Sequence, residues 1–183
     1  MNNQGTRSQT EPRMLTGMFR DKETSESAYR SLRERGYSDD EINVMMSEDT
    51  RNKYWGDDDA AEDSELGSKA LEGTGVGTII GGTLGAILGG AAAIGTNLVL
   101  PGLGLVVAGP IAAALAGAGA GGLTGGIAGA LIGWGIPEDR AKFYEGGIRE
   151  GGTVLGVTPR NDEDAAYFEN EWRDKYRGEH IYR

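Results

Sequence analysis

The stretch that decides the fold runs from Gly73 to Pro137 and reads GTGVGTIIGGTLGAILGGAAAIGTNLVLPGLGLVVAGPIAAALAGAGAGGLTGGIAGALIGWGIP. It contains no Asp, Glu, Lys or Arg, so every charged residue of the chain lies before it or after it. An uncharged stretch of this length between two polar ends predicts an apolar insertion that interrupts a soluble domain.

Two ladders of glycine lie inside this stretch, each with five members spaced four residues apart. Residues four apart stack on nearly the same face of an α-helix, so each ladder predicts a groove without side chains along one helix. We expect these glycines to form a helix-packing and oligomer interface. The ladders are Gly73, Gly77, Gly81, Gly85 and Gly89, and then Gly117, Gly121, Gly125, Gly129 and Gly133.

Glycine ladders reduce the stability of a helix. Each glycine costs about 0.8–1.0 kcal/mol relative to alanine, so five cost about 4–5 kcal/mol per helix. We expect close approach of a second helix to offset that loss, because small residues at this spacing permit it. A flexible linker is the alternative, but linkers lack the large aliphatic residues that are interleaved here. These are Ile79, Ile80, Leu84, Ile87, Leu88, Leu115, Leu123, Ile127, Leu131 and Ile132.

The insertion is predicted to be a helical hairpin, and we assign it to residues 73–136. Its first helix begins in the acidic segment 48–72 and runs to about Ile94. The second begins at Pro110, since proline suits the first turn of a helix, and runs to about Trp134. The segment 98–109 between them contains a Pro-Gly pair and is predicted to be the turn.

Both ends of the chain show a β-α-β pattern. The first unit, residues 13–47, has a predicted strand at 14–19, a helix at 25–35 that Gly36 ends, and a strand at 41–47. The second end, residues 137–183, has a predicted helix at 138–150, a strand at 152–158, a helix at 162–176 that Gly178 ends, and a strand at 180–182.

Two β-α-β units of similar length predict an α+β protein. Specifically, they predict a ferredoxin-like split β-α-β sandwich, interrupted by a long glycine-zipper α-helical hairpin. Neither unit has enough core to fold alone, so we expect them to form one four-stranded sheet with helices over one face. Residues 1–12 are polar and are predicted to be a disordered tail.

Charge and composition exclude several classes of function. The formal net charge is −10, which argues against nucleic acid as a partner. The chain has no cysteine, which excludes disulfides, thiolate metal sites and a cysteine nucleophile. No apolar signal segment occurs in the first seventy residues, so no cleavable secretory signal is expected, and the absence of cysteine suits a cytoplasmic location.

No motif points to catalysis, a cofactor or a metal. The run Gly73–Gly77 lacks the preceding strand and the later acidic residue of a nucleotide loop, so helix packing explains it better. The acidic cluster Asp57–Asp63 lacks the glycine and glutamate of an EF-hand loop, which favours a solvated loop. His180 is the only histidine and is expected on the surface or an edge strand. The chain is therefore predicted not to be an enzyme.

Aromatic residues flank the apolar stretch at its charged ends. Tyr54-Trp55 precede it, and Trp134 and Phe143-Tyr144 lie at or beyond its end. Aromatic side chains gather at membrane interfaces, but packing between the sandwich and the hairpin accounts for them equally well. Glu138 and Asp139 begin a predicted helix, where acidic side chains favour the positive end of the helix dipole.

Two environments suit the hairpin. Each predicted helix reaches the roughly 20 apolar residues that span a bilayer, but their Gly and Ala content weakens the drive for insertion and the turn carries no charge. Alternatively, hairpins from several copies pack into one apolar core in water. Exposure of so much apolar surface would cause aggregation, so we expect a homo-oligomer that associates with membrane lipid through residues 73–136. A soluble oligomer is the alternative.

The order of several short motifs resembles the bacterial general stress protein 17M-like family and is similar to cyanobacterial proteins described as low-temperature-induced. The matching residues are Thr16-Gly17-Met18-Phe19, Gly36-Tyr37, Ile42-Asn43-Val44-Met45, Leu100-Pro101-Gly102-Leu103-Gly104, Ala108-Gly109-Pro110-Ile111-Ala112, Leu131-Ile132-Gly133-Trp134-Gly135-Ile136-Pro137-Glu138, Tyr144-Glu145-Gly146-Gly147 and Gly151-Gly152-Thr153-Val154. The resemblance extends from about Met14 to Ile181. It implies a stress association and supplies no catalytic residues.

The sequence thus predicts a non-enzymatic stress-response protein without a cofactor. Its glycine-zipper helices assemble copies of the chain at or in the inner membrane, and its acidic sandwich faces the cytoplasm. Two further hypotheses stay open. The sandwich is a ligand-binding module, as ferredoxin-like folds often are, or the chain is a regulatory adaptor whose helices pack on a partner.

Overall fold

The computed structural model describes residues 13–55, 97–100, 104–112 and 126–183. The predicted tail at 1–12, the acidic cluster at 57–63, the whole first glycine ladder and three glycines of the second ladder lie outside these residues. Those predictions stay untested. The three glycines are Gly117, Gly121 and Gly125.

The described residues form an α+β fold, as predicted. Its strands are Leu15–Phe19 (β1), Ile42–Ser47 (β2), Asn97–Leu100 (β3), Leu105–Ala108 (β4), Thr153–Val157 (β5) and Glu179–Tyr182 (β6). Its α-helices are Lys22–Glu34 (α1), Glu48–Trp55 (α2), Gly126–Gly133 (α6), Glu138–Arg149 (α7) and Asp162–Asn170 (α8). A 3₁₀ turn covers Asp39–Glu41, and a π-helical turn covers Glu171–Lys175.

One sheet joins the two ends of the chain. Its strand order is β3-β4-β2-β5-β1-β6, and every neighbouring pair is antiparallel. β5 therefore lies between β1 and β2, and β1 lies between β5 and β6. Each β-α-β unit is split by a strand of the other, so the two units interleave within one sheet.

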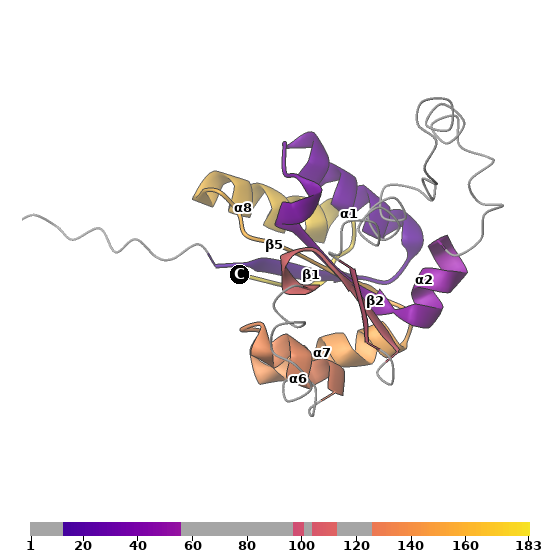
Figure 1. Ribbon diagram of the computed structural model, residues 1–183. Helices are drawn as coiled ribbons and strands as arrows, with labels where there is room; N and C mark the ends of the chain where they lie inside the picture. The colour runs from indigo at the N-terminus through magenta and orange to yellow at the C-terminus, as the bar shows by residue number, and fades with distance from the viewer. Residues whose placement is uncertain (1–12, 56–96, 101–103, 113–125) are drawn as a thin grey trace, which may run out of the picture.

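Helices cover both faces of this sheet (Figure 1). α1 and α8 lie on one face, and α6 and α7 lie on the other, which corrects the expectation that only one face is covered. Successive strand residues alternate between two cores. In β1, Leu15 and Phe19 join the α1–α8 core, whereas Met18 joins the α6–α7 core. Burial on both faces explains why β1 and β5 are buried along their whole length.

The predicted turn of the helical hairpin is wrong, because Asn97–Leu100 and Leu105–Ala108 are strands of the sheet. β3 and β4 pair with each other, and β4 continues along β2 from Val44 opposite Ala108 to Ser47 opposite Leu105. β4 is buried throughout and reads Leu-Val-Val-Ala, a composition that suits a strand packed on both faces. The insertion thus adds two strands to the four that its flanking units supply.

The second predicted helix is not continuous. Residues 110–112 are helical and α6 covers 126–133, but Gly126 has a φ of +68°. A left-handed residue interrupts an α-helix, so one unbroken helix does not run from Pro110 to Trp134. The segment predicted as an acidic linker also contains a helix, α2, which begins directly after β2.

Local signals set the ends of the flanking helices. Asp21 caps α1 by accepting a hydrogen bond from the Thr24 amide at 2.8 Å, and Gly36 ends that helix with a φ of +86°, as predicted. At the end of α8 and its π-helical turn, however, the left-handed residue is Arg177, with a φ of 54°, and not Gly178. Gly178 instead donates its amide to the Trp172 carbonyl at 2.6 Å.

Gly109 fixes the point where the chain leaves β4. It has a φ of +91°, and a Cβ atom there would lie 2.1 Å from the Ile42 carbonyl oxygen of β2. Beside it, the Asn43 carboxamide accepts from the Ile111 amide at 2.8 Å and donates to the Gly156 carbonyl at 3.3 Å. The inserted strands are therefore attached to β2 and β5 by close backbone contact and a buried amide.

Gly109→Ala is expected to lower the free energy of unfolding by about 3–5 kcal/mol, because it combines a positive φ with a steric collision. Gly104→Ala is the matched control, since Gly104 has a φ of +58° with nothing within 4 Å of its Cβ position. It should cost only about 1–2 kcal/mol. Urea unfolding measures both, and equal losses would contradict the proposed contact with β2.

Candidate functional site

The described part of the second glycine ladder lies on α6. The sheet-facing side of this helix is filled by its aliphatic residues, of which Ile127 and Leu131 are almost fully buried. Gly129 is half-buried and Gly133 is exposed, so both ladder glycines are more accessible to solvent than Ile127 and Leu131. Ile132, beside Gly133, has 43% of its surface exposed, although it is a large apolar residue.

Gly133 faces open space. No atom of a described residue lies within 4 Å of the position that its Cβ would occupy. Two residues later the helix is closed, because Gly135 has a φ of +92° and the Ile136 amide donates to the Leu131 carbonyl at 3.1 Å. Within the described residues, therefore, no neighbouring backbone uses the groove at the end of the ladder.

The flanking aromatic residues pack inside the fold. Tyr54 lies against the α1–α8 core, and Trp134 and Phe143 lie against the α6–α7 core. Tyr144 is fully buried, and its hydroxyl donates to the His180 carbonyl at 2.6 Å. These contacts favour the packing interpretation of the aromatic residues over a membrane interface.

A pocket of about 240 Å³ opens next to Trp134. Its lining comes from the start of β1, from the connection between α6 and α7, and from the end of β6. The residues are Arg13, Met14, Thr16, Trp134, Gly135, Ile136, Tyr182 and Arg183. Among the described residues, two arginines and no acidic side chain line it, in a chain whose net charge is −10.

A second pocket, of about 450 Å³, lies where β1 ends and α2 begins. Cations and carboxylates line it together, among them Arg20, Lys53, Asp49 and Glu150. Arg20 donates to Glu150 at 2.6 Å and to Glu179 at 2.9 and 3.0 Å, and these partners raise its pKa. Because cations and carboxylates both line it, this pocket shows no preference for either sign of ligand.

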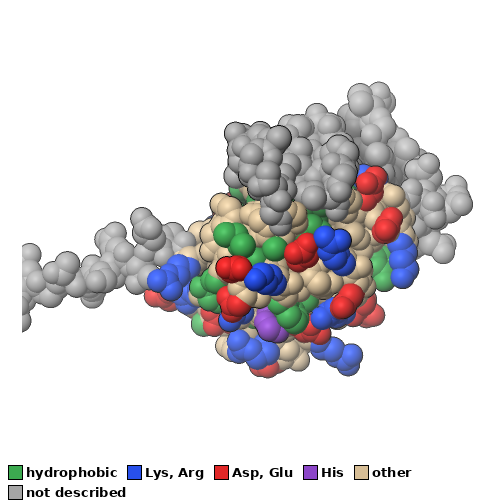
Figure 2. Space-filling model, turned by 90° about the horizontal axis from the view of Figure 1, so that it is seen from below, with side chains coloured by type: hydrophobic (Ala, Val, Ile, Leu, Met, Phe, Trp, Pro, Cys, Tyr) green, Lys and Arg blue, Asp and Glu red, His purple; other side chains and the backbone are tan. Residues whose placement is uncertain are grey.

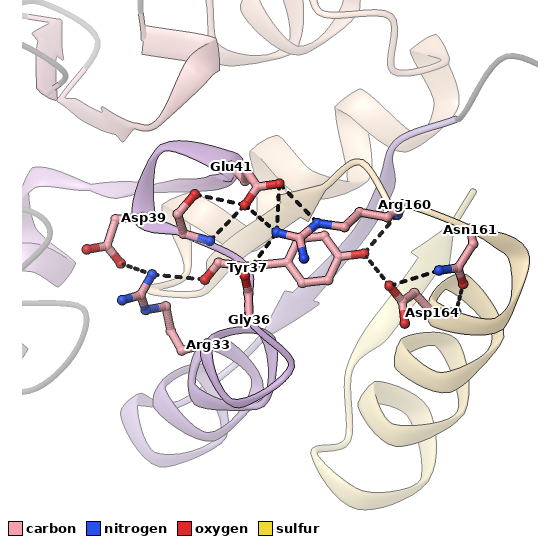
Figure 3. A network of polar contacts seen from close by, with 9 residues as sticks. Arg33, Gly36, Tyr37, Asp39, Glu41, Arg160, Asn161 and Asp164 are labelled. Carbon is pink, nitrogen blue, oxygen red and sulfur yellow. Dashed lines mark hydrogen bonds and ion pairs between the residues drawn. The ribbon is translucent and has the colours of Figure 1, made fainter.

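A polar network joins the connection after α1 to the connection before α8 (Figure 3). Arg160 donates to the Glu41 carboxylate at 2.8 Å and to the Gly36 carbonyl at 2.9 Å. Its own amide donates to the Tyr37 hydroxyl at 2.8 Å, and that hydroxyl donates to Asp164 at 2.8 Å. The network therefore links the two β-α-β units by side chains as well as by strand pairing.

Hydrogen bonds to the carboxylates shift their pKa values. Arg160, followed by Ser38, lowers the pKa of Glu41 to about 2. Arg35, whose Nε lies 2.6 Å from Asp164, lowers the pKa of that carboxyl, and Tyr37 adds to the effect. Both acids are therefore anions at neutral pH and already have cationic partners. We interpret the network as structural, because each of these charged groups is satisfied by a neighbour.

His180 lies on edge strand β6, as predicted, and is exposed. Its ring stacks on Phe143, with ring centroids 3.4 Å apart. Figure 2 shows the face that carries the histidine, where acidic and basic side chains are interspersed with hydrophobic ones. Glu138 and Asp139 lie in the first turn of α7, as expected, and Glu138 pairs with Lys142 at 2.6 Å.

No helix within the described ranges is long and apolar enough to cross a membrane. No protein-family model matches the chain, and no curated protein or solved structure matches it.

Sequence reasoning missed the pocket beside Trp134 and the network around Tyr37. Both depend on residues that are distant in the chain, such as Tyr37 and Asp164, or Arg13 and Trp134. One signal was available, because Asn161 before an acidic first turn indicates the cap of α8, which holds Asp164 in place. No signal in the sequence indicated which side chains would form hydrogen bonds with Asp164.

The Glu41–Arg160 pair predicts that stability depends on acid pH. The pKa of Glu41 is about 2 in the fold, against an ordinary value of 4.5. A group with a lowered folded pKa stabilises the protein above its unfolded pKa and loses that contribution as pH falls through the folded value. We expect the free energy of unfolding, measured by urea titration, to fall between about pH 5 and pH 2.

Arg160→Gln tests the cause of this pH dependence. Without the guanidinium, the pKa of Glu41 should move towards its ordinary value, and the slope of stability against pH should become shallower. Arg173→Gln removes an exposed arginine outside the network and serves as the control. An unchanged slope in Arg160→Gln would contradict this account.

Proposed function

We propose that this chain is a non-enzymatic bacterial stress-response protein that assembles with copies of itself through its glycine-zipper segment, at or in a membrane. The fold we propose is a ferredoxin-like split β-α-β sandwich with an insertion between its two units. The interleaved order of β2, β5, β1 and β6 supports this assignment. The likeness to the general stress protein 17M-like family supports the stress association.

One observation carries the proposal for self-assembly. α6 turns Ile127 and Leu131 towards the sheet and leaves Gly133 and Ile132 exposed, with Gly129 only half-buried. Two helical glycines cost about 2 kcal/mol relative to alanine. Since nothing lies near the Cβ position of Gly133, no contact within the described chain explains why a glycine stands there. Close approach of a second helix explains the glycine at position 133, because a larger side chain would prevent it.

Ile132, the exposed apolar residue next to the ladder, also supports self-assembly. Ile132 lies between Gly129 and Gly133 in the sequence of α6, and it supplies apolar surface beside a strip of bare backbone. Such a combination suits a helix packing against another helix, because the glycines allow close approach and the isoleucine fills the space beside them. The partner that we propose is the same segment of a second copy.

Gly133→Leu is expected to reduce the oligomer to a smaller species, because the added side chain blocks close approach of the partner helix. The fold should tolerate it, since the Cβ position is open and leucine favours helix over glycine by almost 1 kcal/mol. Gly146→Leu on α7 is the matched control, because its Cβ position is equally open and it is outside the ladder. Sedimentation velocity measures the masses, and circular dichroism verifies folding.

An unchanged mass for folded Gly133→Leu would remove α6 from the assembly interface. Carbonate extraction of membranes from cells that express the full chain separates the two environments. Retention with lipid supports membrane association, and release as a discrete oligomer supports the alternative, a soluble homo-oligomer with the hairpins in a common core. Release as a monomer would contradict self-assembly in both forms.

A further inference from the structure

We propose that the pocket beside Trp134 binds a small aromatic carboxylate. This inference is independent of self-assembly and concerns the sandwich itself. The pocket is lined by two arginines, two large aromatic residues and an apolar floor. Each of these features restricts the chemistry of the ligand.

The aromatic walls of the pocket are held in place. A Cβ atom on Gly156 would lie 2.7 Å from the Trp134 ring, so the glycine in β5 lets the indole lie close to the sheet. The Trp134 amide is bonded to the Ala130 carbonyl at 3.2 Å, which fixes the start of the loop. Across the pocket, the Arg140 guanidinium lies 4.3 Å from the centre of the Tyr182 ring. Pre-positioned rings of this kind favour a flat, apolar ligand body.

The charge of the pocket selects an anion. Among the described residues, its charged lining side chains are those of Arg13 and Arg183, and none of its lining side chains is acidic. Arg183 donates to Asp162 from one of its two terminal amino groups, so this contact leaves its other guanidinium donors available. Arg13 is exposed and makes no hydrogen bond or ion pair with any described residue. An arginine with free donors binds a carboxylate through two parallel hydrogen bonds.

The size of the pocket limits the ligand to one or two fused rings. Its volume of about 240 Å³ is below the range of about 300–1,000 Å³ that is typical of sites for drug-sized ligands. The Thr16 hydroxyl is not free to donate a hydrogen bond to the anion. Tyr144 donates its proton to the His180 carbonyl, so the Thr16 hydroxyl, 3.1 Å from the Tyr144 oxygen, must donate to Tyr144. The arginines at the rim are thus the groups that bind the carboxylate.

The pocket near α2 is less suited to an anion. The larger pocket near α2 has acids among its cations, and Arg20 there is already shared by two carboxylates. An incoming anion would have to displace those partners. The pocket beside Trp134 presents cations over an apolar floor of Met14 and Ile136, which matches the two ends of an aromatic carboxylate.

Isothermal titration calorimetry of the full chain with indole-3-carboxylate tests the proposal. We expect saturable binding at one site per chain, and we expect binding of the neutral indole-3-carboxamide to be at least about tenfold weaker, because it cannot pair with arginine as an anion. Inorganic phosphate is the third probe. If phosphate binds as tightly as indole-3-carboxylate, the aromatic walls contribute nothing and the proposal is wrong.

Arg13→Gln locates the site. It should weaken binding of indole-3-carboxylate by about tenfold to a hundredfold and leave binding of the carboxamide nearly unchanged. Arg173→Gln removes the same charge from an exposed position outside the pocket and should bind as the parent chain does. Equal affinity of Arg13→Gln and the parent chain, or no binding by the parent at millimolar probe, would overturn the proposal. Neither result bears on self-assembly, because Arg13 lies outside the glycine ladder.

Discussion

The pairing of β5 between β1 and β2 is the contact on which the rest of the structure depends. β5 is antiparallel to both strands over five residue pairs each, so it converts two separate β-α-β units into one sheet. Each of the two cores contains residues from both units. A long stretch of chain separates β2 from β5, and the entropy of closing such a connection rises only slowly with its length. This is why the fold tolerates a long apolar insertion at that point.

The insertion contributes to the sheet and to one layer of helices. β4 extends the sheet beside β2, and α6 leads into α7, which covers the face opposite α1 and α8. Close approach between layers depends on glycine, because a Cβ on Gly147 of α7 would lie 1.9 Å from the Met18 sulfur. On the other face, a Cβ on Gly17 would lie 2.9 Å from the Trp172 ring. The two layers thus pack on β1 at adjacent residues, Gly17 and Met18.

The elements with clear local signals could be predicted from the sequence. β1, α1, β2, α7, β5 and α8 have hydrophobic periodicity, caps or stop residues within their own segments, and the structure contains all of them. β3 and β4 could not be separated from a turn, because a Pro-Gly pair and a short uncharged run fit a hairpin of helices as well as one of strands. The break at Gly126 was hidden among many glycines at helical spacing, since only the backbone φ distinguishes a ladder glycine from a turn glycine. The network of Tyr37, Arg160 and Asp164 depends on strand pairing, and one sequence does not show which distant side chains that pairing brings together.

Gly133 and Trp134 are adjacent in the chain, but they lie in different surroundings. Gly133 is exposed at the end of the ladder with open space beside it, whereas the Trp134 ring turns inward against Gly156. The positive φ of Gly135 ends α6 directly after this pair, so the direction of both residues is set by one helix terminus. A partner helix packed against Gly133 would therefore constrain the same turn that holds the wall of the arginine-lined pocket. Because the turn is short and the buried Ile136 fixes its far end, a single structural element sets both the exposed position of Gly133 and the inward position of the Trp134 ring.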